Sequence, residues 1–395
     1  MKNILLLNST VDHAFGFFRS FERLKGYNFF WADSVRFAPA RKARCCKKFF
    51  RVPAVSSGKA YIDSLLEIVK SYKIDIILPI GEYETKMVAG NIDIIRDAGA
   101  EVPVASERDI ILATDKLKLT NHCSDYDINY PNTVLLKGDQ IEKSEGLTFP
   151  VIVKQRSGTG QRGLRIINNK KLFQDFLYES VIDHETDPFI IQEFIPGYDH
   201  ENMYSVGLIF NRGTLVSLVP LKKIRAQKFT GGTCTASYAV NDPELIAFAE
   251  RIGGSFPDWH GIMDIEIKKD PRTDRYMLIE INPRPWGCMY GAMAAGVDFP
   301  RIWLDIANNR KVEKHPGFST ENYAAFFARD SLLLFELLVE ILFGKQKRQA
   351  LSVLRTFKFP YFVRRNNRLY SKTSDFVISD IRPLFTNIAR QMYNK

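Results

Sequence analysis

The sequence predicts an α/β protein, α+β in part, whose N-terminal region is a small doubly wound domain. The chain opens with KNILLLNST, which has the pattern of a buried strand followed by a polar loop. A helical stretch, SLLEIVKSYK, leads directly into a second apolar strand, IDIILPIGE. Strands that alternate with helices indicate a parallel sheet with crossover connections. We therefore expect a doubly wound domain over residues 1–105. The loop after its first strand, NST, does not match the Gly-rich dinucleotide fingerprint.

Length and composition are those of an ordinary globular protein. The chain has 395 residues, enough for two or three domains, with 45% hydrophobic and 25% charged residues. Its five cysteines show no metal-ligand spacing, which favours a reducing, cytoplasmic compartment. The start of the chain lacks the pattern of a signal peptide, and no apolar run reaches the roughly 18 residues that span a bilayer.

The most informative segment is YMLIEINPRPWG, an apolar strand with a polar group at every second position. Glu280, Asn282 and Arg284 should share one face, because side chains alternate between the two faces of a strand. Polar groups amid such apolar neighbours are costly to bury unless they form a site. Two prolines interleave with them, and since proline is excluded from the middle of a sheet, the strand should end at a rim that a ligand can reach.

A second strand, GIMDIEIKKD, lies just upstream, where Asp264 and Glu266 alternate with apolar residues in the same way. The short polar turn between the two strands predicts a hairpin. Glu266, Glu280 and Asn282 can then meet across adjacent strands. Oxygen ligands of this kind suit Mg²⁺, whose other ligands are usually waters and nucleotide phosphates. Because neither histidine nor cysteine joins the cluster, the pattern does not favour zinc.

The middle of the chain holds a Gly-rich turn between two apolar strands, in FPVIVKQRSGTGQRGLRII. Glycines let backbone amides approach an anion closely, and the strand before the turn ends at Lys154. The hairpin fits neither the Walker A pattern nor the dinucleotide fingerprint. Together with a magnesium site further along the chain, it favours a nucleotide lid over a plain flexible turn. The residues of this candidate lid are Ser157, Gly158, Gly160 and Gly163.

A further strand leads into QEFIPG, where a polar hinge at Gln192 and Glu193 precedes a turn. A hinge of this kind can expose backbone groups to the edge of a base. With this segment the order of the motifs resembles that of the ATP-grasp superfamily, specifically the carboxylate-amine ligases of the carbamoyl-phosphate synthase large-subunit-like type. The resemblance covers roughly the first three quarters of the chain, and the ordered series of motifs is more specific than any one of them.

The resemblance implies an ATP-grasp fold behind a pre-ATP-grasp domain. Residues 1–105 would be the pre-ATP-grasp domain and residues 106–195 the central lid subdomain. Residues 196–310 would be the subdomain with the metal site. The remainder, residues 311–395, would be a helical, basic C-terminal extension.

The resemblance also implies residues for the phosphates and the metal. Lys116, in ATDK, and Lys154 are similar to the lysines that contact the ATP phosphates. Glu266 matches the first metal-binding acid, Glu280 the carboxylate that bridges two Mg²⁺ ions, and Asn282 the carboxamide beside it. Mn²⁺ is an alternative to Mg²⁺ in such a site.

For the nucleoside, the resemblance points to the hinge and the segment after it. Glu193 and Ile195 fall where the family holds adenine, mostly through backbone groups, and Gln192 lies beside them. Glu201 is the candidate for the ribose hydroxyls, and Asp199 is the alternative.

For the reacting groups, Arg284 is similar to the family arginine that faces the transferred phosphoryl group or the acceptor carboxylate. Lys223 and Arg225, in LKKIRAQKFTGGTC, occupy a region that usually touches the γ-phosphate or substrate, and of the two we favour Arg225. Residues 230–235 are either a substrate loop or an ordinary surface loop.

The reaction implied joins a small-molecule carboxylate to an amine through an acyl phosphate, and it releases ADP and phosphate. Such catalysis rests on positioning and electrostatics, so it needs no protein nucleophile. A protein that binds ATP only to sense it or to scaffold a complex is the alternative. Phosphorylation of a carboxylate or carbamate as the end product is a third reading. A homodimer is the assembly that the resemblance implies.

The end of the chain is basic and lies beyond the resemblance. SLLLFELLVEILFG predicts an amphipathic helix packed on a domain, with Glu336 and Glu340 on one face. The following segment is rich in Lys, Arg and aromatic residues and contributes to the net charge of +10. Three readings stay open: a packed helical extension with a basic outer face, a surface that contacts anionic lipid on the inner face of the membrane, and a nucleic-acid patch. We favour the first and do not expect a nucleic-acid partner.

Overall fold

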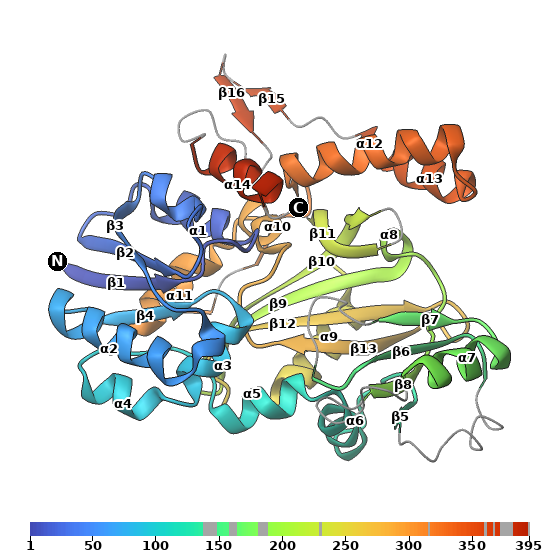
Figure 1. Cartoon of the computed structure of the whole chain (residues 1–395), viewed down its shortest axis with the longest axis horizontal. Coiled ribbons are helices and arrows are strands. Elements are labelled where there is room, and N and C mark those ends of the chain that lie inside the picture. The colour runs from blue at the N-terminus through green and yellow to red at the C-terminus, as the bar shows by residue number, and fades with distance from the viewer. Residues whose placement is uncertain are drawn as a thin grey trace.

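The N-terminal part of the chain is the predicted parallel sheet with helices around it (Figure 1). The strand order is β3-β2-β1-β4, and each neighbouring pair is parallel. Residues 4–7 of the central strand β1 are fully buried, as a strand covered on both faces requires. The strands are β1 (Lys2–Leu7), β2 (Tyr27–Asp33), β3 (Cys46–Arg51) and β4 (Ile76–Pro79). The helices are α1 (Ala14–Phe21), α2 (Lys59–Tyr72), α3 (Glu82–Ala89) and α4 (Ile92–Asp97), with short 3-10 turns η1 (Pro39–Lys42) and η2 (Val55–Ser57).

This computed structural model describes most of the chain. The described residues are 1–136, 148–157, 164–180, 189–228, 231–314, 317–358, 362–365, 368–371 and 382–393. The predicted lid glycines Gly158, Gly160 and Gly163 lie outside them, as does Thr230 in the candidate substrate loop.

A small antiparallel sheet with its own core follows the parallel domain. Its strand order is β5-β8-β6-β7, and β6 and β7 form the hairpin that was predicted around the Gly-rich turn. Val153, Phe173 and Ile191 belong to a separate apolar cluster, so this subdomain has its own packing. The elements are α5 (Glu107–Thr114), α6 (Lys116–Asp125), β5 (Thr133–Leu135), β6 (Val151–Gln155), β7 (Arg165–Ile167), α7 (Lys170–Ser180) and β8 (Phe189–Glu193).

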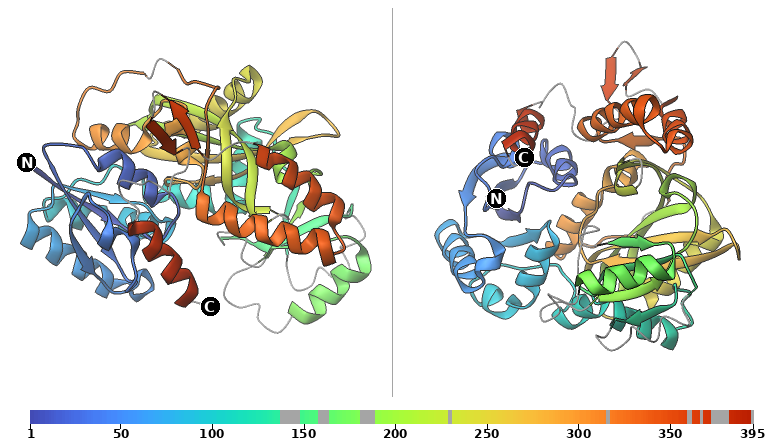
Figure 2. Two further views of the ribbon diagram at one scale, coloured as in Figure 1. Left: turned by 90° about the horizontal axis from the view of Figure 1, so that it is seen from above. Right: turned by 45° about the vertical axis from the view of Figure 1, so that its right-hand side comes forward.

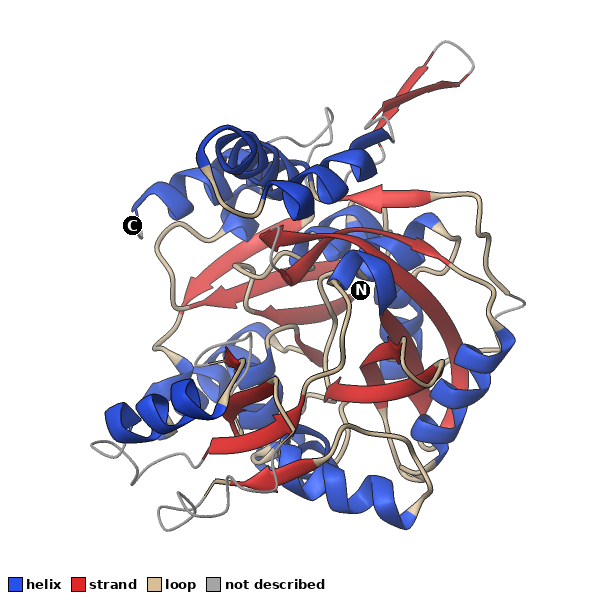
Figure 3. Ribbon diagram, turned by 90° about the vertical axis from the view of Figure 1, so that its right-hand side faces the viewer, coloured by secondary structure: helices blue, strands red, loops and turns tan. Residues whose placement is uncertain are grey.

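The largest sheet carries the predicted hairpin of acids at one edge. Its order is β13-β12-β9-β10-β11-β14, and neighbouring strands are antiparallel. Figure 3 shows its strands crossing the middle of the molecule with helices above and below. The strands are β9 (Met203–Asn211), β10 (Thr214–Lys228), β11 (Gly231–Ala239), β12 (Gly261–Asp270), β13 (Arg275–Asn282) and β14 (Tyr323–Ala325). The helices are α8 (Asp199–Asn202), α9 (Pro243–Gly254), α10 (Met289–Ala294) and α11 (Phe299–Ala307).

The parallel domain and the large sheet share one apolar core. Phe17 of α1 packs edge-on against Trp303 of α11, with ring centroids 6.1 Å apart. The indole of Trp303 donates to the Pro103 carbonyl at 2.7 Å, and the Ser20 hydroxyl donates to Asp298 at 2.8 Å. Because these contacts join the two parts, the carboxyl ends of β1 and β4 are held beside the large sheet.

The end of the chain lies outside the large sheet (Figure 2). It contains α12 (Phe327–Phe343), α13 (Lys347–Leu354), the turn η4 (Arg355–Lys358), the short hairpin of β15 (Phe362–Arg365) and β16 (Arg368–Ser371), and α14 (Arg382–Tyr393). The predicted helical extension is therefore interrupted by a strand pair. β14, beyond residue 310, adds to the large sheet beside β11. Within the described residues, no helix has the length and hydropathy needed to cross a membrane.

Candidate nucleotide and metal site

The register of β12 and β13 brings the predicted acids together. Glu266 lies opposite Glu280, and Asp264 lies opposite Asn282. The Asn282 amide donates to Asp264 at 3.0 Å, and Asp264 also accepts from the Ser205 hydroxyl at 2.6 Å. The predicted hairpin is thus confirmed. It adds Asp264, which is buried and to which the sequence analysis assigned no role, although its alternation with Glu266 was visible there.

Cations surround Glu280. Burial acts to raise the pKa of Glu280, but Lys154, Lys116, Lys223 and Arg284 outweigh it, so this pKa lies below its ordinary value. Glu280 is therefore ionised at neutral pH and can bind a metal ion.

Lys154 is itself buried, at 7% exposure. Burial lowers its pKa to about 8, with Lys116 acting in the same direction and Glu280 and Glu266 opposing. An ammonium group with so little hydration has strong interactions with any anion that reaches it. The lysine at the end of β6 and the acids at the end of β13 thus form one electrostatic unit, as the sequence predicts for a phosphate and its metal.

Glu266 and Asp264 lack such a surplus of positive charge. Burial raises the pKa of Glu266 to about 7 and the pKa of Asp264 to about 6, and Lys223 opposes the shift in both. Glu280 and Asp264 add like-charge repulsion at Glu266. A divalent cation between these oxygens would relieve that repulsion, so the donor set fits Mg²⁺.

Such a metal would depend on ligands from the nucleotide. Among the residues that the structure describes, no three carboxylate, thiol or imidazole groups converge closely enough to hold a metal ion on their own. Mg²⁺ usually keeps several waters and is held by one or two carboxylates together with substrate phosphates. Glu266 and Glu280 are arranged as in a magnesium site that substrate phosphates complete.

Lys223, not Arg225, reaches the acids. The ammonium group of Lys223 donates to Glu266 at 2.7 Å, and its side chain is 4% exposed. Arg225 points away from the acids. Its guanidinium donates to Asp330 of α12 at 2.6 and 2.9 Å and to the Thr356 carbonyl at 2.8 Å. The structure therefore does not bring Arg225 to the acids, because this side chain is bound in a buried ion pair that holds α12 to β10.

Arg284 connects the site to the parallel domain. It donates to the Asn282 side-chain oxygen at 3.1 Å and to the Pro285 carbonyl at 2.9 Å. It also lies 3.6 Å from Glu82, the first residue of α3, which follows β4. The surroundings of Arg284 thus include an acid from outside the hairpin. Glu82 was not predicted, although it is the last residue of the segment IDIILPIGE.

The phosphate-side residues meet at the start of α6. Asp115 caps this helix by accepting from the amides of Leu117 and Lys118, and it also forms an ion pair with Arg156 at 2.7 Å. The ammonium group of Lys116 lies 3.4 Å from the Arg156 carbonyl. These contacts fix α6 beside the start of the Gly-rich turn, where Ser157 is exposed.

The hinge residues occupy the end of β8. Gln192 is buried and donates to the Thr133 hydroxyl at 2.9 Å, whereas Glu193 accepts from Arg272 at 2.6 Å. Because both side chains are bound to neighbours, a base at this hinge would meet backbone groups. Ile195 is buried at 3% exposure and supplies an apolar wall.

The two ribose candidates lie in the short helix α8. Glu201 is exposed and accepts from the Tyr198 amide at 2.9 Å. Asp199 is half-buried and accepts from the Gly232 amide at 3.4 Å. Both carboxylates keep an oxygen that can accept from a hydroxyl, so the choice between them stays a prediction.

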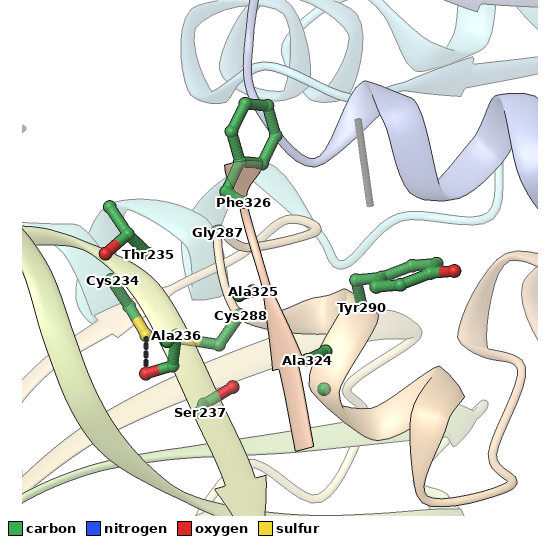
Figure 4. A pocket seen from close by; sticks show the side chains of 11 residues that line it. Cys234, Thr235, Ala236, Ser237, Gly287, Cys288, Tyr290, Ala324, Ala325 and Phe326 are labelled. Carbon is green, nitrogen blue, oxygen red and sulfur yellow. Dashed lines mark hydrogen bonds between the residues drawn. The ribbon is translucent and has the colours of Figure 1, made fainter. Parts of the chain in front are cut away.

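A small pocket lies beside the acids, between β11, β14 and the segment that follows Arg284 (Figure 4). Its lining includes Cys234, Thr235, Cys288 and Tyr290. The Thr235 hydroxyl is buried and has no hydrogen-bond partner within the described part of the chain. The end of the candidate substrate loop, at Cys234 and Thr235, thus lines this pocket.

Comparison with known proteins agrees with this geometry. Residues 113–288 match the model of an ATP-grasp domain, and residues 14–103 match that of a PylC-like N-terminal domain. A D-aspartate ligase of Enterococcus faecium is 22% identical over an alignment of 330 positions that covers 75% of this chain and 75% of that protein.

Solved structures share the fold. N5-carboxyaminoimidazole synthetase from Staphylococcus aureus has a TM-score of 0.63 at 16% identity and covers 85% of each chain. The biotin carboxylase domain of 2-oxoglutarate carboxylase from Hydrogenobacter thermophilus, solved with MgADP and bicarbonate, has a TM-score of 0.63 at 14% identity, covering 82% of this chain and 73% of that one.

A Rossmann-like domain, a lid hairpin and a sheet edge with paired acids define an ATP-grasp protein. The chain contains an ATP-grasp domain behind a PylC-like N-terminal domain.

Proposed function

We propose that this protein activates a carboxylate as an acyl phosphate and joins it to an amine, with release of ADP and phosphate. The observation that carries the proposal is the pair Glu266 and Glu280, facing each other across two strands with Lys154 and Lys223 nearby. This combination of paired carboxyl groups and buried ammonium groups suits a triphosphate with its metal and offers no nucleophile of its own.

ATP would lie between the lid subdomain and the large sheet. Lys116 and Lys154 would contact its phosphates, and the backbone from Gln192 to Ile195 would hold the adenine. Glu266, Glu280 and Asn282 would hold Mg²⁺, and Mn²⁺ accepts the same oxygen ligands. When bound, the metal would neutralise phosphate charge and orient the γ-phosphoryl group.

The reacting carboxylate would lie beside Arg284, whose guanidinium can bind it with two parallel hydrogen bonds. A carboxylate oxygen would attack the γ-phosphorus, and the bond from this phosphorus to the bridging oxygen of ADP would break. The amine would then attack the acyl carbon, lose a proton and displace inorganic phosphate. We assign to Lys223 the contact with the γ-phosphate or substrate that the sequence suggested for Arg225.

The test is product analysis with pools of carboxylates and amines. Purified protein with MgATP should release ADP and phosphate only when a productive pool is added, and Glu280→Gln should release neither. AMP with pyrophosphate would contradict the acyl-phosphate route, because it would indicate adenylation. ATP binding without product release from any pool would favour the sensor or scaffold reading.

A further inference from the structure

The outward side of α12 is apolar and exposed. It carries Leu332, Phe335, Leu338, Val339, Leu342 and Phe343, and we refer to these six residues as the α12 face. Phe335, Leu342 and Phe343 are 69%, 64% and 82% exposed. Large apolar residues that gather on one surface of a protein usually mark a contact with a partner or a membrane.

The opposite side of α12 explains why these residues point outward. Leu333 and Leu337 are fully buried and pack with Ala350 and Val353 of α13. Asp330 is also buried and pairs with Arg225 of β10. The orientation of the helix is therefore fixed by its inner side. The prediction of an amphipathic helix packed on a domain is confirmed for that side alone, since the α12 face has no such packing within the described residues.

The charges around the α12 face have one sign. Residues 331–357 are all described, and the exposed charged residues among them are Lys345, Lys347, Arg348 and Arg355. The acids Glu336 and Glu340 are half-buried, and Glu340 accepts from the Gln346 amide at 2.6 Å. An exposed apolar helix face whose own segment, residues 331–357, exposes cations and no acid is complementary to an anionic lipid surface.

We propose that the α12 face lies in the interface of an anionic membrane, with the helix parallel to the surface. The apolar side chains would enter the boundary of the acyl chains, and Lys345, Lys347 and Arg348 would contact lipid phosphates. Figures 1 and 2 show α12 and α13 on the outside of the large sheet. A two-fold pairing of α12 with itself suits the face less well, because the exposed charged residues within 331–357 are all cations and would repel one another.

The apolar part of the proposed lipid contact, residues 332–343, precedes the basic segment that follows Gly344. Point substitutions on α12 test this contact directly. A truncation after residue 345 would keep the whole α12 face and would remove α13, on which α12 packs. The contact requires no substrate and no ATP, so its outcome is independent of the ligase reaction.

The experiment is flotation of the full-length protein with vesicles at physiological salt. We expect the wild type to float with vesicles of 30% phosphatidylglycerol in phosphatidylcholine and not with pure phosphatidylcholine. Phe335→Gln with Leu342→Gln should lower the partition coefficient at least tenfold. Ile94→Gln is the matched control, because Ile94 is 45% exposed on α4, and it should float like the wild type.

A second variant tests the charges separately. Changing Lys345, Lys347 and Arg348 to Gln should also lower partition at least tenfold, and salt should lower wild-type partition in the same way. Thermal unfolding of each variant would verify that it is folded. The proposal would be overturned by a wild type that does not float, or by a folded α12 variant that floats like the wild type. A wild-type dimer that becomes monomeric on substitution, without vesicle binding, would assign the face to a second copy instead.

Discussion

The buried ion pair of Arg225 and Asp330 allows two roles of Arg225 to be distinguished: holding α12 to β10, or taking part in the reaction. In the structure both side chains are fully buried, and one carboxylate oxygen accepts from two guanidinium nitrogens at 2.6 and 2.9 Å. Asp330→Ala would leave the guanidinium buried without its counter-charge. Breaking a buried pair in this way typically costs about 3–5 kcal/mol. We expect a loss of this size in the free energy of unfolding, measured with urea at pH 7.

Replacing both partners should restore most of the stability. In Arg225→Met with Asp330→Leu no charge is left buried, so the double variant should unfold within about 2 kcal/mol of the wild type. The remaining cost comes from the Thr356 carbonyl, which accepts from Arg225 in the wild type.

The same double variant tests the role of Arg225 in the reaction. It should release ADP at a rate within threefold of the wild type, whereas Lys223→Met should lose roughly 100-fold, the usual effect of removing one preorganised electrostatic group. A folded double variant with less than a tenth of the wild-type rate would refute this reasoning and indicate that Arg225 takes part in the reaction.

Two further predictions concern Lys154 and Gly207. Because the pKa of Lys154 in the folded protein, about 8, is below 10.5, its charge destabilises the nucleotide-free protein at pH 7, and this cost fades as the pH rises towards 10.5. Relative to Lys154→Met, the wild type should gain about 2 kcal/mol of unfolding free energy between pH 7 and 9.5 in urea titrations, and parallel curves would contradict the buried charge. Gly207→Ala would place a methyl group 2.1 Å from the Trp286 ring, so we expect a lower melting temperature and slower turnover, because the ring must shift next to Arg284. Unchanged melting and turnover would exclude this close contact.

Local periodicity was enough to predict the acids. Glu280 and Asn282 share a face because strand alternation is set by neighbouring residues, and the polar turn fixed the pairing with β12. The parallel domain and the lid hairpin followed from similar local patterns.

Contacts between distant segments could not be predicted in this way. Lys223 and Arg225 would share a face by simple alternation, but the pairing of β10 with β11 shifts register between them. The partner of Arg225 is 105 residues further along the chain. Glu82 joins the site for a similar reason, since only the packing of two domains brings it near Arg284.

The C-terminal helices show the same limit. The sequence of α12 predicts an amphipathic helix, but apolar residues occur around most of its circumference. Which of them meet the protein depends on Asp330, which fixes the helix against β10 through Arg225. The exposure of Phe335 and Leu342 is therefore a result of tertiary packing.

The most direct test of the acyl-phosphate reaction is oxygen transfer. The productive carboxylate pool would be labelled with ¹⁸O in its carboxyl groups and incubated with MgATP and amines, and the phosphate released would be analysed by mass spectrometry. We predict one ¹⁸O atom in each phosphate, because the bond between carbon and the attacking oxygen breaks when the amine displaces phosphate. Unlabelled phosphate, or label in AMP, would contradict the reaction proposed for this site.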